Sequence, residues 1–194
     1  EWTGIPYTFA LFSMKMKNGC ICSSSMGSIS INCPTERKTD TLARDMIFSM
    51  AEDDENDIWA GTINSGLFKG HINRNASGKM EIEWKDFNKL LPEKTIRSLH
   101  IDAKGNIWVG TRYSGLVQLS RDTATGEYVS RIFNRSDGFI SDFIKSIISD
   151  EDGNIWIGTH AGIEKLIPTE NGYRLFSFSK VHNFFATVIK LATG

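Results

Sequence analysis

Short apolar runs separated by polar turns fill most of this chain. The clearest runs are "IRSLHI", "NIWVGT", "GLVQLS" and "YVSRIF", which are rich in Ile, Val, Trp, Phe and Tyr. None of them reaches the roughly 10–12 residues of a typical helix. Runs of this length and composition, bounded by Gly, Asp and Asn, are typical of β-strands. The pattern therefore predicts an all-β fold built from short antiparallel strands.

The strand pattern recurs along the chain. Three copies each open on an Ile that lies 12 residues before a Trp, and a Gly-Thr pair follows the Trp closely. The opening residues are Ile47, Ile96 and Ile144, and the structural signature positions are Trp59, Trp108, Trp156, Gly61, Gly110 and Gly158. A degenerate copy precedes them from Leu11, with Cys22 at the Trp position and Ser24-Ser25 in place of Gly-Thr. Because the Trp residues are 49 and 48 residues apart, each copy fits a unit of four strands.

A repeated four-stranded unit predicts a β-propeller of about four blades, which makes a small or partial ring. We expect a degenerate blade at 9–46, clear blades at 47–88, 96–133 and 144–179, and a C-terminal extension of undetermined role at 180–194. The Trp of each copy is expected to fill the space between neighbouring blades, and the Gly beside it to allow a close approach. Since an incomplete ring leaves blade faces and strand edges uncovered, the chain is also expected to self-associate.

The segment "DEDGNIWIGTHAGIEKL" at 150–166, with "SDGFISDFIKSI" leading into it, resembles the two-component regulator propeller repeat. The resemblance covers roughly residues 9–179 and is strongest over 47–167. It implies a periplasmic, ligand-sensing propeller, often for glycan fragments, in a bacterial hybrid histidine kinase, notably of gut Bacteroidetes. The kinase would lie outside this chain, which carries no kinase or other catalytic motif. The alternatives are a propeller lyase of the streptogramin-lyase type and a protein-interaction propeller.

Composition narrows the range of partners. The 194 residues carry 23% charged side chains and a net charge of −1, which argues against nucleic-acid binding. No apolar run approaches the ~20 residues that span a bilayer, so a membrane is expected only through missing parts of a parent chain. The first residues lack the features of a signal peptide and there is no initiator Met, so we treat the chain as a processed or excised piece.

Three features could carry other chemistry. Asp150, Asp152 and Asn154 form a loop that is similar to part of a calcium loop, but Lys104 replaces Asp152 in the preceding copy, so a hairpin turn without metal is favoured. The "GTHAG" segment lacks the Lys of a P-loop, and no cofactor is expected. Cys20, Cys22 and Cys33 are interpreted as three buried thiols, with a Cys20–Cys33 or Cys22–Cys33 bridge left open. The four histidines, His71, His100, His160 and His182, share no motif.

The turns that vary among the copies are the best candidates for ligand binding. In a four-stranded meander, the loops between strands two and three share one end of the ring with the blade-to-blade connections at 89–94 and 136–142. That end would carry Asn64, Arg112, Tyr113 and His160. Variable loops on a common scaffold are typical of binding sites. Because Tyr113 suits stacking on a sugar and Arg112 suits pairing with an acidic sugar, we expect an oligosaccharide or other small-molecule ligand.

Overall fold

The computed structural model describes residues 12–170 and 172–179, so the expected extension at 180–194, with His182, lies outside the described residues. Within them, the chain forms strands β1 to β15 and two single-turn 3-10 helices. The strands make antiparallel meanders in which each strand pairs with the next one along the sequence. The predicted all-β fold of four-stranded antiparallel blades is confirmed.

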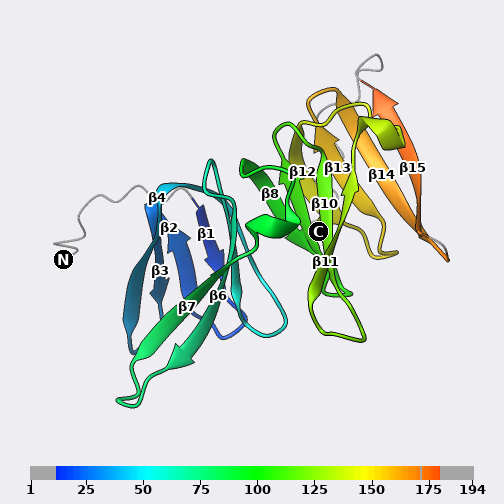
Figure 1. Ribbon diagram of the computed structural model, residues 1–194. Coiled ribbons are helices and arrows are strands. Elements are labelled where there is room, and N and C mark those ends of the chain that lie inside the picture. The colour runs from blue at the N-terminus through cyan, green and yellow to red at the C-terminus, as the bar shows by residue number, and fades with distance from the viewer. Residues whose placement is uncertain (1–11, 171, 180–194) are drawn as a thin grey trace. The chain divides into compact units, whose positions relative to one another are not determined.

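The first seven strands form one continuous sheet (Figure 1). They are β1 (Phe12–Lys15), β2 (Ile21–Ser24), β3 (Met26–Asn32), β4 (Arg37–Glu52), β5 (Ile58–Thr62), β6 (Leu67–Arg74) and β7 (Met80–Asp86). Strand β4 serves two meanders, because Thr39 pairs with Ser30 of β3 whereas Ala51 pairs with Trp59 of β5. Only 37 residues separate Cys22 from Trp59, so the last strand of the degenerate copy runs directly into the first strand of the next.

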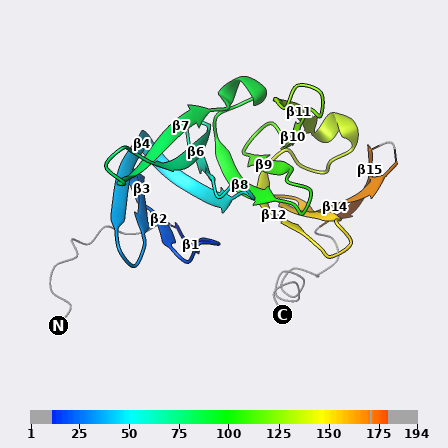
Figure 2. The same ribbon diagram turned by 90° about the horizontal axis from the view of Figure 1, so that it is seen from below.

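Two separate four-stranded sheets follow (Figure 2). The first contains β8 (Ile96–Ile101), β9 (Ile107–Thr111), β10 (Leu116–Arg121) and β11 (Tyr128–Phe133). The second contains β12 (Ile144–Ser149), β13 (Ile155–Thr159), β14 (Gly162–Thr169) and β15 (Gly172–Ser179). Helix η1 (Asn88–Leu90) precedes the first of these sheets, and η2 (Arg135–Asp137) connects the two.

The chain divides into two compact units, residues 1–89 with 94–96 and residues 90–93 with 97–194. In the first unit, Cys22, Ile29 and Ile31 pack with Ile47 and Ile58 in one apolar core. In the second unit, the core lies between the β8–β11 and β12–β15 sheets. It contains Trp108, Leu116, Phe133, Phe139, Ile144, Ile147, Ile155, Ile157 and Leu166. The core of the first unit therefore lies between the two meanders of one continuous sheet, whereas the second unit packs one sheet face on another, as blades of a propeller do.

One aspartate holds the first turn of every clear copy. In the β8–β9 turn, Asp102 Oδ1 accepts hydrogen bonds from the backbone N–H groups of Lys104 (2.9 Å) and Asn106 (3.0 Å). Its Oδ2 accepts the indole N–H of Trp108 at 2.9 Å. Asp53 and Asp150 bind the indoles of Trp59 and Trp156 in the same way, at 2.9 and 2.8 Å. The aspartate therefore fixes both the hairpin and the orientation of the Trp six residues later.

The Gly-Thr pair connects one copy to the next. A Cβ on Gly61 would lie 2.5 Å from Ile96 Cγ2, and a Cβ on Gly110 would lie 2.7 Å from Ile144 Cγ2. Since both distances are far below van der Waals contact, only glycine leaves room for the opening Ile of the following copy. The threonine closes the second turn, as Thr111 Oγ1 does by donating to the Gly115 carbonyl at 2.7 Å.

The Trp residues take two environments. Trp108 is fully buried and meets Tyr173 of the next sheet edge to face, with ring centroids 5.5 Å apart. It thus fills the space between two blades, as expected. Trp156 is only partly buried and stacks on Phe178 of its own sheet at 6.2 Å.

The expectation of three thiols is wrong. Cys20 and Cys33 form a disulfide, with Cα atoms 4.4 Å apart, whereas Cys22 is free and buried. The register explains the pairing, because Ile21 faces Asn32 across β2 and β3 and the next pair outward is Cys20 and Cys33. The disulfide therefore closes the open end of this hairpin.

Candidate functional site

Phe143 is the centre of an aromatic and cationic cluster in the second unit. It lies just before β12, where its carbonyl accepts the backbone N–H of His160 at 3.0 Å. This bond brings the β13–β14 turn onto Phe143, and the two rings stack with centroids 5.8 Å apart and planes 9° apart. An exposed imidazole therefore lies flat on a half-buried phenyl ring.

Three cations surround the same ring. The Phe143 centroid lies 5.7 Å from Arg97 Cζ, 6.0 Å from Arg112 Cζ and 5.7 Å from Lys145 Nζ. Arg112 also lies over the ring of Tyr113 at 5.1 Å, and Tyr113 is 66% exposed. Among the described residues, neither Arg112 nor Lys145 forms a salt bridge. The cluster therefore presents aromatic surface and unpaired positive charge side by side, which suits a ligand with a flat apolar face and an anionic group.

The structure thus brings together three of the four residues predicted to bind ligand, Arg112, Tyr113 and His160. Asn64 lies in the first unit, where its backbone N–H and that of Ser65 donate to Asp45 Oδ2 at 2.5 and 2.8 Å. We call Arg97, Arg112, Tyr113, Phe143, Lys145 and His160 the Phe143 cluster. The sequence prediction missed its central residue, although the position before each opening Ile varies among the copies as the turns do.

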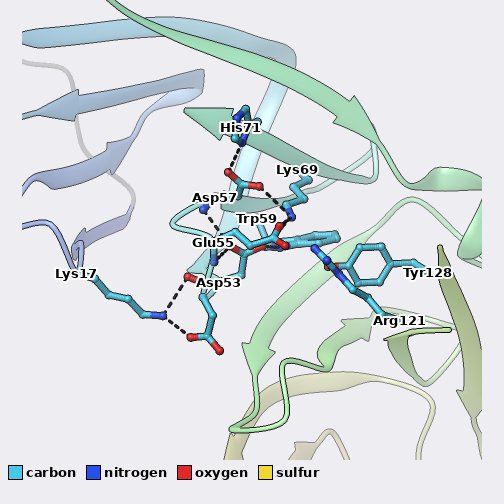
Figure 3. A network of polar contacts seen from close by, with 10 residues as sticks. Lys17, Asp53, Glu55, Asp57, Trp59, Lys69, His71, Arg121 and Tyr128 are labelled. Carbon is cyan, nitrogen blue, oxygen red and sulfur yellow. Dashed lines mark hydrogen bonds and ion pairs between the residues drawn. The ribbon is translucent and has the colours of Figure 1, made fainter. Parts of the chain in front are cut away.

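A second polar group surrounds Lys69 of β6 in the first unit. Figure 3 shows its ammonium pointing between the side chains of Asp53, Glu55 and Asp57, and it lies 2.9 Å from an oxygen of each. In the two later copies an Asn stands at the Asp57 position, and its amide donates to the turn aspartate, as Asn106 does to Asp102 at 2.9 Å. Asp57 cannot donate in this way, so the ammonium of Lys69 bridges Asp53 and Asp57 instead.

We call Lys69 together with Asp53, Glu55 and Asp57 the Lys69 cage, and the contacts among them explain the pKa values of Lys69 and Asp53. Burial opposes charge on Lys69, but its bonds to Glu55, Asp57 and Asp53 outweigh burial and raise its pKa. Burial likewise opposes charge on Asp53, yet the bonds from Lys69 and Trp59 hold its pKa below the ordinary value. The carboxylate oxygens of Asp53, Glu55 and Asp57 lie within 4.8 Å of one another, as in a metal site. In this protein the ammonium group of Lys69 occupies the position that a metal cation would take among these carboxylates.

Glu164 of β14 is a buried carboxyl beside the connection that leads to Phe143. One carboxylate oxygen accepts the backbone N–H of Ile140, and Oε2 has no partner among the described residues. Burial raises the pKa of Glu164 to about 7, and the charge of Asp142 adds to this, whereas the Ile140 N–H opposes it. The register places Glu164 where the earlier copies have Phe68 and Val117, so a charge at an apolar position was the signal available in the sequence.

Two segments of the chain, residues 90–113 and 138–161, match the sequence profile of the two component regulator propeller. These segments contain all six residues of the Phe143 cluster. These two segments therefore carry the two-component regulator propeller repeat. The resemblance inferred from the sequence is confirmed, and no curated protein sequence matches this chain.

Solved structures share the fold of these propeller repeats. The extracellular domains of two hybrid two-component systems of B. thetaiotaomicron superpose with TM-scores of 0.67 and 0.63, at 24% and 19% identity. They cover 92% and 88% of this chain, which spans only 24% of each of those domains. Virginiamycin B lyase of Staphylococcus aureus superposes with a TM-score of 0.64 at 13% identity, over 90% of this chain and 57% of the lyase. At such identities these likenesses establish the fold alone.

Within the described residues of this propeller chain, there is no helix long and apolar enough to cross a membrane.

Replacing the caged lysine should expose the acidic turn of the first clear propeller repeat. The Lys69→Met variant leaves Asp53 and Asp57 facing each other, so we expect a loss of about 2–4 kcal/mol in the free energy of unfolding. Calcium should restore part of this loss, because it can occupy the three carboxylates, and should leave the wild type unchanged. Urea denaturation with and without calcium measures both effects.

Lys165→Met is the matched control, because Lys165 occupies the same position in the last repeat but lies 3.6 Å from Asp150 and is half-buried. We expect it to cost less than about 1 kcal/mol and to show no calcium response. Equal losses of unfolding free energy in Lys69→Met and Lys165→Met would contradict this account of the Lys69 cage.

Glu164 should make stability depend on pH. Its folded pKa of about 7 lies above the unfolded value of roughly 4.3, so its favourable contribution is complete below pH ~4 and is lost as the pH rises toward 7. Glu164→Gln should therefore match the wild type near pH 4.5 and exceed it at pH 8 by up to about 3 kcal/mol. Urea denaturation at both pH values tests this, with the exposed Glu170→Gln as control. A Glu164→Gln variant that is less stable at pH 8 would contradict the assignment.

Proposed function

We propose that this chain is a ligand-sensing propeller segment of an extracytoplasmic two-component sensor, that it recognises glycan fragments, and that it signals to a histidine kinase outside the chain. The observation that carries the proposal is the Phe143 cluster. The cluster combines side chains from the variable turns of two successive propeller repeats. The turn whose aspartate binds the Trp indole is nearly the same in each repeat. A scaffold of constant turns with specialised loops is what a family of sensors for different ligands requires.

The chemistry of the cluster favours an acidic oligosaccharide. The exposed rings of Tyr113 and His160 offer flat faces to a sugar ring, and Arg112 offers two parallel N–H donors to a carboxylate or sulfate. Arg97 and Lys145 add positive charge around Phe143. A neutral sugar would leave the charges of Arg112 and Lys145 uncompensated, so we expect a preference for uronic or sulfated sugars.

A periplasmic location fits the cysteine chemistry. The Cys20–Cys33 disulfide is of a kind that persists in oxidising compartments such as the bacterial periplasm. The similar domains of B. thetaiotaomicron are described as extracellular. Both observations support placing this propeller outside the cytoplasm.

Two variants test the ligand site. Arg112→Ala/Tyr113→Ala removes one cation and one exposed ring, and should weaken binding of an acidic oligosaccharide at least about tenfold by isothermal titration calorimetry. The matched control is Arg121→Ala/Tyr128→Ala, a second Arg–Tyr pair with the cation 5.3 Å from the ring centroid, outside the Phe143 cluster. It should bind as the wild type does.

The probes are neutral and uronic-acid oligosaccharides of matched length, and the bound sugar is recovered for product analysis. An intact ligand supports a sensor, whereas a shortened or unsaturated product would favour the lyase alternative. Unchanged affinity in the Arg112→Ala/Tyr113→Ala variant would rule out this site.

A further inference from the structure

The buried carboxyl of Glu164 is bonded to the segment that leads into the Phe143 cluster. The residue is 0% exposed; one carboxyl oxygen accepts the backbone N–H of Ile140, and the other has no partner among the described residues. Ile140 also packs on the same strand, because a Cβ on Gly162 of β14 would lie 2.8 Å from Ile140 Cδ1. Glu164 therefore helps to hold the segment 140–143 in place.

The same segment is bonded to both turns that supply the cluster. The carbonyl of Asp142 accepts the backbone N–H of Gly115, which ends the turn of Arg112, at 3.0 Å. The carbonyl of Phe143 accepts the backbone N–H of His160, also at 3.0 Å. A shift of this segment would therefore move the Arg112 turn and the His160 turn together, and the buried carboxyl is bonded to its first residue.

The surroundings of Glu164 favour its neutral form. Its cross-strand neighbours are Ile157 of β13 and Ser177 of β15, and neither carries a charge. The β8–β11 sheet contributes apolar side chains to the core on the same side. Burial raises the pKa of Glu164 to about 7, the N–H of Ile140 opposes the rise, and the charge of Asp142 adds to it. The charged group that acts on Glu164 thus has the same sign as an ionised Glu164.

We propose that an acidic ligand binds the Phe143 cluster together with one proton, which is taken up from solvent and held by Glu164. This inference rests on the proposed function, because the ligand supplies the added negative charge. A carboxylate or sulfate at the cluster adds to the charge of Asp142, so binding favours the neutral form of Glu164. An ionised Glu164 would leave a buried carboxylate with a single donor, which favours displacement of the segment 140–143 and of both turns. By linkage, the ligand and the proton strengthen each other's binding.

The affinity for the ligand should therefore fall as the pH rises through 7. Below this pH the free protein already holds the proton, whereas above it binding must take the proton from solvent. With a pKa of about 7 in the free protein, the affinity should fall by up to about tenfold between pH 6 and pH 8. The carboxylates of a uronic-acid ligand stay ionised over this range, so the charge of the ligand does not change.

Isothermal titration calorimetry with a uronic-acid oligosaccharide at pH 6, 7 and 8 tests the proposal. Histidine changes charge between pH 5 and 8 and His160 is in the cluster, so the wild type is compared with Glu164→Gln. The variant keeps an oxygen for the Ile140 N–H but takes up no proton. It should bind as the wild type does at pH 6, and its ratio of affinities at pH 6 and pH 8 should be up to about tenfold smaller. Glu170→Gln, at an exposed turn residue, is the matched control and should keep the wild-type ratio.

Titrations in two buffers of different ionisation enthalpy count the protons directly. At pH 7.5 the wild type should take up roughly half a proton more than Glu164→Gln. Equal pH dependence and equal proton uptake in the two proteins would overturn the proposal and leave the ligand site standing, as would a Glu164→Gln variant that binds weakly at pH 6. A wild type that binds the oligosaccharide at none of these pH values would overturn the proposed function and this inference with it.

Discussion

The hydrogen bond from a Trp indole to the first aspartate of the preceding turn is the interaction on which the repeats depend. Asp102 orders its own hairpin through backbone N–H groups and holds the Trp108 ring in the plane that the next sheet must meet. One short side chain thus links local turn chemistry to packing between blades. Without it, the indole N–H would be buried without a partner and the turn would lose its acceptor.

The same constraint explains how the first clear copy could change. Because Asp57 stands where the later copies have an asparagine, this turn holds two carboxylates, and Lys69 of the neighbouring strand supplies the cation between them. The solution is local and leaves the Asp53–Trp59 bond intact. The turns at Arg112 and His160 contain neither the Trp nor the opening Ile of a repeat. Their sequences can therefore differ among the repeats without disturbing the packing between blades.

The sequence predicted the parts of the structure that depend on neighbours along the chain. Spacing alone located the strands of each copy and the position of Trp108 between blades. It did not locate contacts that depend on register or on a distant strand. The Cys20–Cys33 pair required the alignment of β2 with β3, and the role of Lys69 required its position across from Trp59. The role of Phe143 could not be predicted from the sequence, because the residues that surround its ring come from three separate segments.

A comparison of two turn aspartates tests the central claim most directly. Asp102 and Asp122 both accept backbone N–H groups in exposed turns, but only Asp102 also holds a buried indole. Urea denaturation should show that Asp102→Ala lowers the free energy of unfolding by about 2–4 kcal/mol and Asp122→Ala by about 1 kcal/mol. Equal losses would contradict the account, because the bond to Trp108 would then add nothing beyond the turn.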